Sequence, residues 1–154
     1  MKVIEGDQRV TNEHFGIVVS KYNGTITEKL LEGAIATLTE RGAIAEQIDV
    51  VRVPGAWEIP IAAQRMLGSG DYAAILCLGA VIKGETTHDT YINQQVSGSL
   101  GQLALETKTP VLFGLLTCQT IEQAKNRAGG RVGNKGSQCA EAAVEMVSLL
   151  RQLG

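Results

Sequence analysis

The most apolar run of the 154-residue sequence, YAAILCLGAVI at residues 72–82, limits the folds that the chain can adopt. A strand with one face in water alternates apolar and polar residues, whereas this run is apolar at nearly every position. Continuous hydrophobicity of this kind is typical of a central strand in a parallel sheet covered on both faces. The run therefore predicts an interior strand with helices on either side.

The rest of the chain alternates strand and helix patterns around this run. Further strands are predicted at residues 15–20, 48–53 and 111–116. Apolar residues at helical spacing predict helices that include residues 30–38, 61–67, 92–103 and 140–147, with a short helix at 120–129 and a glycine-rich break after it. Four strand–helix repeats require crossover connections between parallel strands. We expect one α/β domain over residues 1–154, a three-layer α/β/α sandwich with a four-stranded parallel sheet.

Composition excludes several classes of partner. The 14 Lys and Arg nearly balance the 16 Asp and Glu, for a net charge of -2. Because no basic cluster offers phosphate contacts, we expect no nucleic-acid or membrane-surface partner. The polar start, MKVIEGDQRV, is unlike a leader, and no apolar run approaches the ~20 residues of a membrane span. A cytoplasmic location is expected.

The three cysteines, Cys77, Cys118 and Cys139, are far apart and lack metal-binding spacing. We interpret them as buried thiols in a reducing compartment. The alternative is a catalytic thiol that uses His88 as its base. No histidine has a cysteine near it in ligand spacing, so no metal site is expected.

Ligands of open parallel sheets bind beyond the carboxyl ends of the strands, so residues 21–25, 54–60, 82–88 and 116–120 should converge there. In the third segment, Gly84 allows a tight turn and threonines precede a helix start, where unpaired amides attract an anion such as phosphate. A plain helix cap is the alternative. His88 then falls in the first helical turn, either as a proton donor and acceptor or as a surface histidine.

Aromatic and acidic residues stand in the other loops. In VPGAWEIP, Ala56, Trp57 and Glu58 could cradle a polyol, or form a packed loop with an acid at a helix start. Tyr22 and Phe113 could stack on a flat heterocycle, although Phe113 taken alone is typical of a core residue.

The stretch NRAGGRVGNKGS, residues 126–137, is not a phosphate-binding P-loop. A P-loop follows a strand and contains Gly-Lys-Ser or Gly-Lys-Thr. Here Lys135 precedes Gly136, and a helix comes before the loop. Arg127, Arg131 and Lys135 remain as cations beside a break between helices, which is also typical of a solvated basic corner.

Together these motifs resemble the lumazine synthase family, which makes 6,7-dimethyl-8-ribityllumazine in the penultimate step of riboflavin synthesis. The matching blocks occur in the order and at the spacing of the family: VVSKYNGTITEKLLEGA, VPGAWEIP, LGAVIKGETTH, PVLFGLLT, EQAKNRAG and GNKG. The resemblance implies a flavodoxin-like fold and a transferase that needs no metal or organic cofactor. It implies condensation of 5-amino-6-(D-ribitylamino)uracil with 3,4-dihydroxy-2-butanone 4-phosphate, releasing phosphate and water.

The resemblance also implies roles for individual residues. His88 would carry protons, and Tyr22, which replaces the usual phenylalanine or tryptophan, would stack on the pyrimidine. Phe113 would close over the ring from a neighbouring subunit. The remaining contacts would be Ala56, Trp57 and Glu58 to the ribityl chain, Ala80, Val81 and Ile82 to the pyrimidine, Glu85, Thr86 and Arg127 to the butanone phosphate, and Lys135 near the anion.

Family members form pentamers, and many assemble twelve pentamers into an icosahedral shell of 60 subunits. The tight AGGRVGNKG connection and the proline-free start, which could donate an edge strand to a neighbour, favour the shell here. Association with a riboflavin synthase is a further possibility. Two other functions stay open: a non-catalytic flavin- or phosphate-binding module, and a structural shell protein with a decayed site.

Overall fold

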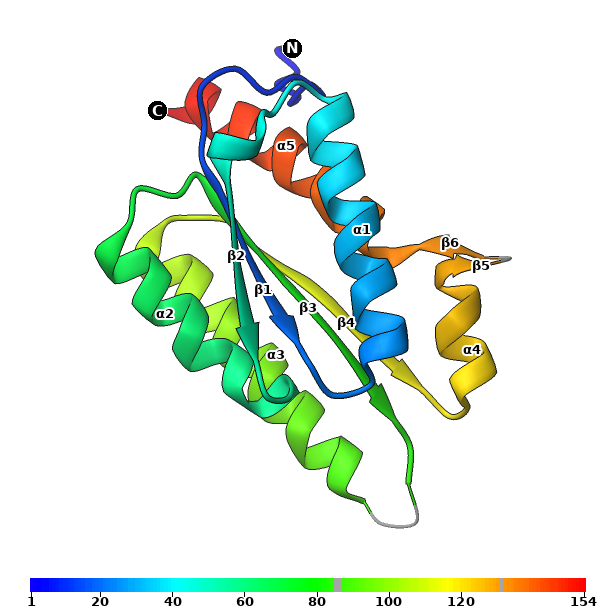
Figure 1. Cartoon of the computed structure of the whole chain (residues 1–154). Coiled ribbons are helices and arrows are strands. Elements are labelled where there is room, and N and C mark those ends of the chain that lie inside the picture. Colours follow the sequence, from blue (N-terminus) through cyan, green and yellow to red (C-terminus); the bar gives the residue numbers. More distant parts are fainter. Residues whose placement is uncertain (85–86, 131) are drawn as a thin grey trace.

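The computed structural model describes residues 1–84, 87–130 and 132–154, and its centre is a parallel sheet with helices on both faces (Figure 1). The strands are β1 (Phe15–Ser20), β2 (Ile48–Val53), β3 (Ala74–Ile82) and β4 (Val111–Cys118), in the order β2-β1-β3-β4. Every pairing between them is parallel. The predicted three-layer α/β/α fold is confirmed.

Two apolar layers sandwich the sheet. Helices α1 (Gly24–Glu40) and α5 (Lys135–Leu153) cover one face, and α2 (Ile59–Ser69) and α3 (His88–Thr107) cover the other (Figure 1). Alternate residues of β3 supply both layers, with Leu76 and Leu78 on the α1/α5 side and Ile75 and Cys77 on the α2/α3 side. Eight of the nine β3 residues are buried, which explains the continuous apolar run.

Five short elements complete the described part of the chain, and only one of them was predicted. Helix α4 (Ile121–Asn126) follows β4 as expected. The glycine-rich break after it contains an antiparallel pair, β5 (Ala128–Gly130) and β6 (Gly133–Asn134), with left-handed glycines at Gly129 and Gly133. Strands this short bury almost no side chain, so they leave no apolar alternation in the sequence. The 3-10 turns η1 (Ala45–Gln47) and η2 (Ala56–Glu58) lead into β2 and α2.

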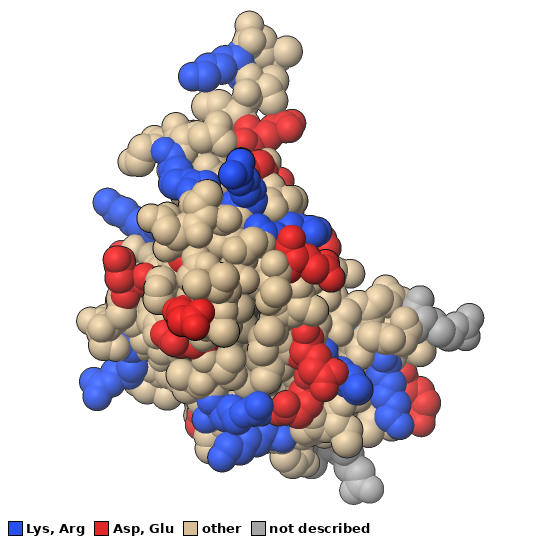
Figure 2. All heavy atoms as spheres, turned by 45° about the horizontal axis from the view of Figure 1, so that its top comes forward, with Lys and Arg blue, Asp and Glu red and all other residues tan. Residues whose placement is uncertain are grey.

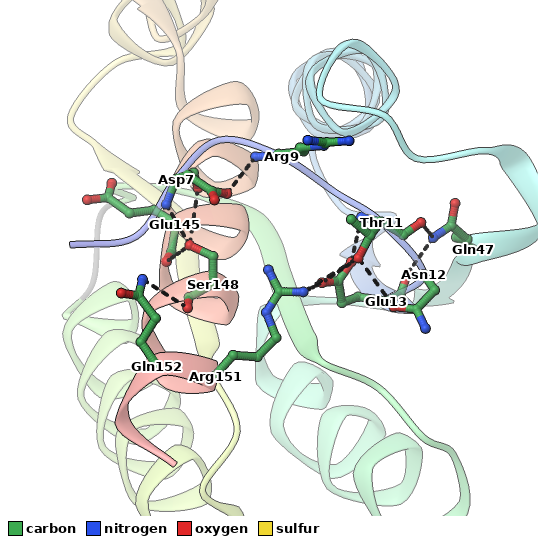
Figure 3. A network of polar contacts seen from close by, with 10 residues as sticks. All are labelled: Asp7, Arg9, Thr11, Asn12, Glu13, Gln47, Glu145, Ser148, Arg151 and Gln152. Carbon is green, nitrogen blue, oxygen red and sulfur yellow. Dashed lines mark hydrogen bonds and ion pairs between the residues drawn. The ribbon is translucent and has the colours of Figure 1, made fainter. Parts of the chain in front are cut away.

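The segment before β1 lies along α5 instead of forming a strand (Figure 3). The Asp7 amide donates to Ser148 Oγ at 2.6 Å, and Gln152 Nε2 donates to the Glu5 carbonyl at 2.6 Å. Val10 is buried, and its amide donates to the Arg41 carbonyl at 2.8 Å. The chain therefore crosses the ends of α1 and α5 before it enters the sheet.

Glu13 holds the last part of this segment. Its carboxylate accepts from the Thr11 amide at 2.8 Å and pairs with Arg151 on α5 (Figure 3). Burial alone would raise the pKa of Glu13, but the Thr11 amide and the Arg151 charge outweigh it and lower that pKa below its ordinary value. Both termini lie at the edge of the sheet where the strands begin, opposite the edge formed by the carboxyl ends of the strands (Figure 1).

Acidic and basic side chains are interspersed on the face shown in Figure 2, with no broad area of one sign. Such a mixed surface lacks the electrostatic footprint of a nucleic-acid-binding face. Across residues 1–84, 87–130 and 132–154, no helix combines the length and hydrophobicity needed to cross a membrane.

The contact between α1 and α5 gives a test of the fold. A Cβ on Gly136 would lie 1.9 Å from the backbone oxygen of Leu30, so the two helices must separate to accept it. We expect Gly136→Ala to destabilise the protein by about 2–3 kcal/mol. Gly68→Ala is the matched control, because a Cβ there meets no atom within 4 Å and alanine favours a helix. Thermal unfolding followed by circular dichroism measures both, and equal melting temperatures would contradict the close packing.

Candidate active site

The carboxyl ends of β1, β2 and β3 and the start of α3 enclose a cavity of about 440 Å³, here called the rim cavity. Parallel strands deliver their following loops to one edge of the sheet, which is why segments distant in sequence meet there. The cavity is lined by Tyr22, Asn23, Gly55, Ala56, Trp57, Glu58, Ala80, Val81, Ile82, Gly84, His88, Asp89 and Ile92.

Two neighbouring loops present aromatic rings at this cavity. The Lys21 amide donates to the Val53 carbonyl at 2.8 Å, and the Tyr22 amide donates to the Pro54 carbonyl at 3.0 Å. These bonds hold the loop after β1 against the loop after β2. Tyr22 and Trp57 are 73% and 54% exposed, so their ring faces are available for stacking on a flat ligand.

The turn η2 places an acid beside Trp57. Glu58 closes the turn, because its Oε1 accepts the Gly55 amide at 2.9 Å. Ile59 behind it is fully buried, and Pro60 lies in the first turn of α2 as predicted. Glu58 is half-buried and lines the rim cavity, where its carboxylate can accept hydrogen bonds from a polyol.

His88 is the first residue of α3 and lines the rim cavity, as predicted. It lies at the positive end of a 20-residue helix, which favours a bound anion nearby. Thr87 is the N-cap residue of α3, as expected for a threonine before a helix, but its side chain makes no capping hydrogen bond. Glu85 and Thr86, predicted at the phosphate, lie outside the described residues.

Two polar residues of the rim cavity were not predicted as site residues. Asn23 lies within residues 21–25, expected at this edge, but was given no role, and no role was assigned to Asp89. Asp89 Oδ1 is buried and has no hydrogen-bond partner within the described part of the chain. The sequence held one signal for Asn23, since asparagine is among the few residues that readily adopt the left-handed conformation found there.

A second cavity, here called the edge cavity, lies beside β4 and encloses about 240 Å³. Its lining residues are Leu115, Leu116, Thr117, Arg127, Val132, Gly133, Lys135 and Gln138, none of which lines the rim cavity. The predicted cations Arg127 and Lys135 are thus brought together, but away from His88. Residues 116–120, expected at the rim, contribute only to the edge cavity.

Phe113 lies on β4 and lines neither cavity. It is 40% exposed, so the interpretation of this residue as part of the core is wrong. Its open ring face is available to another molecule.

All three cysteines are buried, as predicted. Burial raises the pKa of Cys139 to about 11, against a smaller lowering by Lys135, and burial raises the pKa of Cys77 further. Neither cavity includes a cysteine. The alternative of a catalytic thiol is therefore disfavoured, because the reactive form is the thiolate. Within the described ranges, no three His, Cys, Asp or Glu side chains are grouped so that they could hold a metal ion.

Comparison with known proteins decides the family. The family model described as 6,7-dimethyl-8-ribityllumazine synthase matches residues 12–151. The chain belongs to this family. It is 48% identical over 150 residues to a Salinibacter ruber protein named 6,7-dimethyl-8-ribityllumazine synthase, covering 97% of this chain and 96% of that one. The family predicted from the motifs is confirmed, and with it the expectation of a lumazine-forming enzyme.

The buried thiols can be tested directly. At pH 8 a thiol with a pKa near 11 is only about one-thousandth thiolate, so we expect iodoacetamide to leave the folded chain unmodified for hours. In guanidinium chloride all three cysteines should be alkylated within minutes. Mass spectrometry measures both reactions, and rapid alkylation of Cys77 or Cys139 in the folded protein would contradict this assignment.

Proposed function

We propose that the chain condenses 5-amino-6-(D-ribitylamino)uracil with 3,4-dihydroxy-2-butanone 4-phosphate to 6,7-dimethyl-8-ribityllumazine, releasing phosphate and water. The observation that carries the proposal is the rim cavity, where two aromatic rings, a carboxylate and an imidazole meet at the start of a long helix. A heterocycle can stack on the aromatic rings, a polyol tail can donate hydrogen bonds to the carboxylate, and an anion can lie at the start of the helix.

We match each part of the two substrates to a group of residues. Tyr22 stacks on the pyrimidine, and a phenol offers the same ring face as the usual phenylalanine or tryptophan. Glu58 and the backbone of Ala56 and Trp57 hold the ribityl hydroxyls. Ala80, Val81 and Ile82 border the ring at the end of β3. We assign Glu85 and Thr86, which lie outside the described residues, to the butanone phosphate.

His88 moves the protons in this scheme. The amine attacks the ketone and loses water to form an imine, phosphate is eliminated, and ring closure expels a second water; each step transfers a proton. A neutral imidazole has one nitrogen that accepts a proton and one that donates, so it can accept and return these protons. Fixing two substrates in contact supplies several kcal/mol of the barrier reduction without a metal or organic cofactor.

Arg127, Lys135 and Phe113 complete the site from a second copy of the chain. In one chain, Arg127 and Lys135 line the edge cavity, whereas His88 lines the rim cavity. A phosphorylated substrate at the rim cavity needs a positive partner. A heterologous contact, in which the edge of β4 on one copy meets the rim cavity of the next, brings the two halves together and closes into a ring.

We propose that this ring is a pentamer and that twelve pentamers form the 60-subunit shell. The β5–β6 hairpin supports this choice, because it joins α4 to α5 without an insertion. The enzyme acts in the cytoplasm, where a riboflavin synthase consuming its product could associate with the shell.

The two cavities predict unequal effects of mutation. His88→Ala should lower kcat by about 10- to 100-fold without abolishing turnover, since positioning of the substrates survives. Arg127→Ala should lower kcat/KM further, because the phosphate loses its charge partner. Lumazine absorbance after mixing both substrates measures these rates, and the reverse order would contradict the assigned roles.

The same assay separates the alternatives. A non-catalytic flavin-binding module or a decayed shell protein would produce no lumazine. Co-expression of His88→Ala and Arg127→Ala chains tests the shared site, because about a quarter of the sites in a mixed ring would join two unaltered halves. Activity no higher than the sum of the two variants would place both residues in one chain's site.

Assembly has its own prediction. Static light scattering of the purified protein should give the mass of 60 chains. A mass of five chains would retain the ring and refute the shell, and a mass of one chain would refute both.

A further inference from the structure

We propose that Asn23 is a positioning residue for the heterocycle, and that it acts by bonding the end of β3 through its side-chain amide. The proposal rests on the proposed function only for the identity of the ligand. Asn23 lines the rim cavity together with Tyr22 and with Ala80, Val81 and Ile82 at the end of β3.

The backbone of Asn23 is unusual. It adopts φ 58° and ψ 45°, the left-handed region, at the residue before α1. Asparagine in this position usually caps the helix through its side chain, but here it makes no such bond. Instead the Asn23 carbonyl accepts the amides of Ile26 and Thr27 at 2.9 and 3.1 Å. The side chain is therefore left for another partner.

That partner is the Ala80 carbonyl, which accepts from Asn23 Nδ2 at 2.8 Å. The amides of Ile75 and Lys83 donate toward β4, to Pro110 and Cys118. Because alternate residues of a strand bond opposite neighbours, the carbonyl of Ala80 points toward β1.

On that side the β1–β3 ladder has already ended, since its last pair is Val19 with Leu78. The Tyr22 amide, which would continue this ladder toward Ala80, donates instead to the Pro54 carbonyl beside β2. Without Asn23 the carbonyl of the buried residue Ala80 would lose this hydrogen-bond partner. The side-chain amide of Asn23 thus replaces the missing hydrogen bond of the ladder.

As a consequence, the two sides of the slot for the flat ring are held at a fixed separation. The loop that carries Tyr22 is tied to the β2 side by backbone bonds and to the β3 side by Asn23. Loss of the amide frees one side only, so the distance between the Tyr22 ring and Ala80–Ile82 is no longer set. We expect weaker binding of the flat ring with little change in the chemical steps.

Three substitutions separate the amide from the backbone conformation. Asn23→Gly keeps the left-handed conformation and removes the amide, so its melting temperature should stay within about 2 °C of the parent. Asn23→Asp keeps the size but sets a carboxylate oxygen against the Ala80 carbonyl. Asn23→Ala adds backbone strain and should lower the melting temperature by about 4 °C.

Binding of 6,7-dimethyl-8-ribityllumazine, read from the fluorescence of Trp57, the one tryptophan of the chain, is the measurement. Asn23→Gly should weaken binding and raise KM for ribitylaminouracil roughly 3- to 10-fold, with kcat and KM for the butanone phosphate changed less than about twofold. Asn23→Asp should bind more weakly still. Asn12→Gly, an exposed asparagine before β1, is the matched control and should leave every value unchanged.

Parent-like binding by Asn23→Gly, or equal binding by the Gly and Asp variants, would overturn the positioning role. A loss confined to kcat would overturn it as well, because it would assign Asn23 to the chemical steps. If the parent protein binds the lumazine but forms none from the two substrates, the proposed function fails. Weaker binding by Asn23→Gly would then still support the positioning role.

Discussion

Burial of β3 on both faces is the constraint on which the rest of the structure depends. A strand that supplies side chains to two apolar layers must lie inside a sheet, with helices on each side. Parallel neighbours then require crossovers, and the crossovers deliver the loops after β1, β2 and β3 to one edge. The rim cavity is a geometric result of this arrangement, and the chemistry depends on the residues that the loops carry.

The layers and most of the site could be predicted from the sequence because they depend on periodic burial and on loops that directly follow strands. Trp57, Glu58 and His88 meet at the rim for that reason. The β5–β6 hairpin and the left-handed Asn23 could not be predicted, since each depends on a few backbone hydrogen bonds without apolar periodicity. Asp89 was not predicted because the burial of its Oδ1 beside the rim cavity depends on tertiary packing, which has no periodic signal in the sequence.

A different limit of sequence-based prediction applies to Phe113, Arg127 and Lys135. Sequence motifs identify them as a set with His88, but Phe113 lies on the edge strand β4, Arg127 follows α4 and Lys135 begins α5, and none of them lines the rim cavity. Periodicity within one chain contains no information on how copies contact each other. In the proposed ring, a site divided in this way would couple substrate binding to assembly, because the cations of one copy would reach the phosphate bound by its neighbour.

The position of the termini has a practical consequence. Both lie at the end of the sheet opposite the rim cavity, where Glu5, Asp7 and Glu13 fasten the leading segment to α5 (Figures 1 and 3). A fusion partner or affinity handle joined to either terminus would emerge from the far side of the molecule. Such a chimera keeps the mouth of the rim cavity open to small molecules.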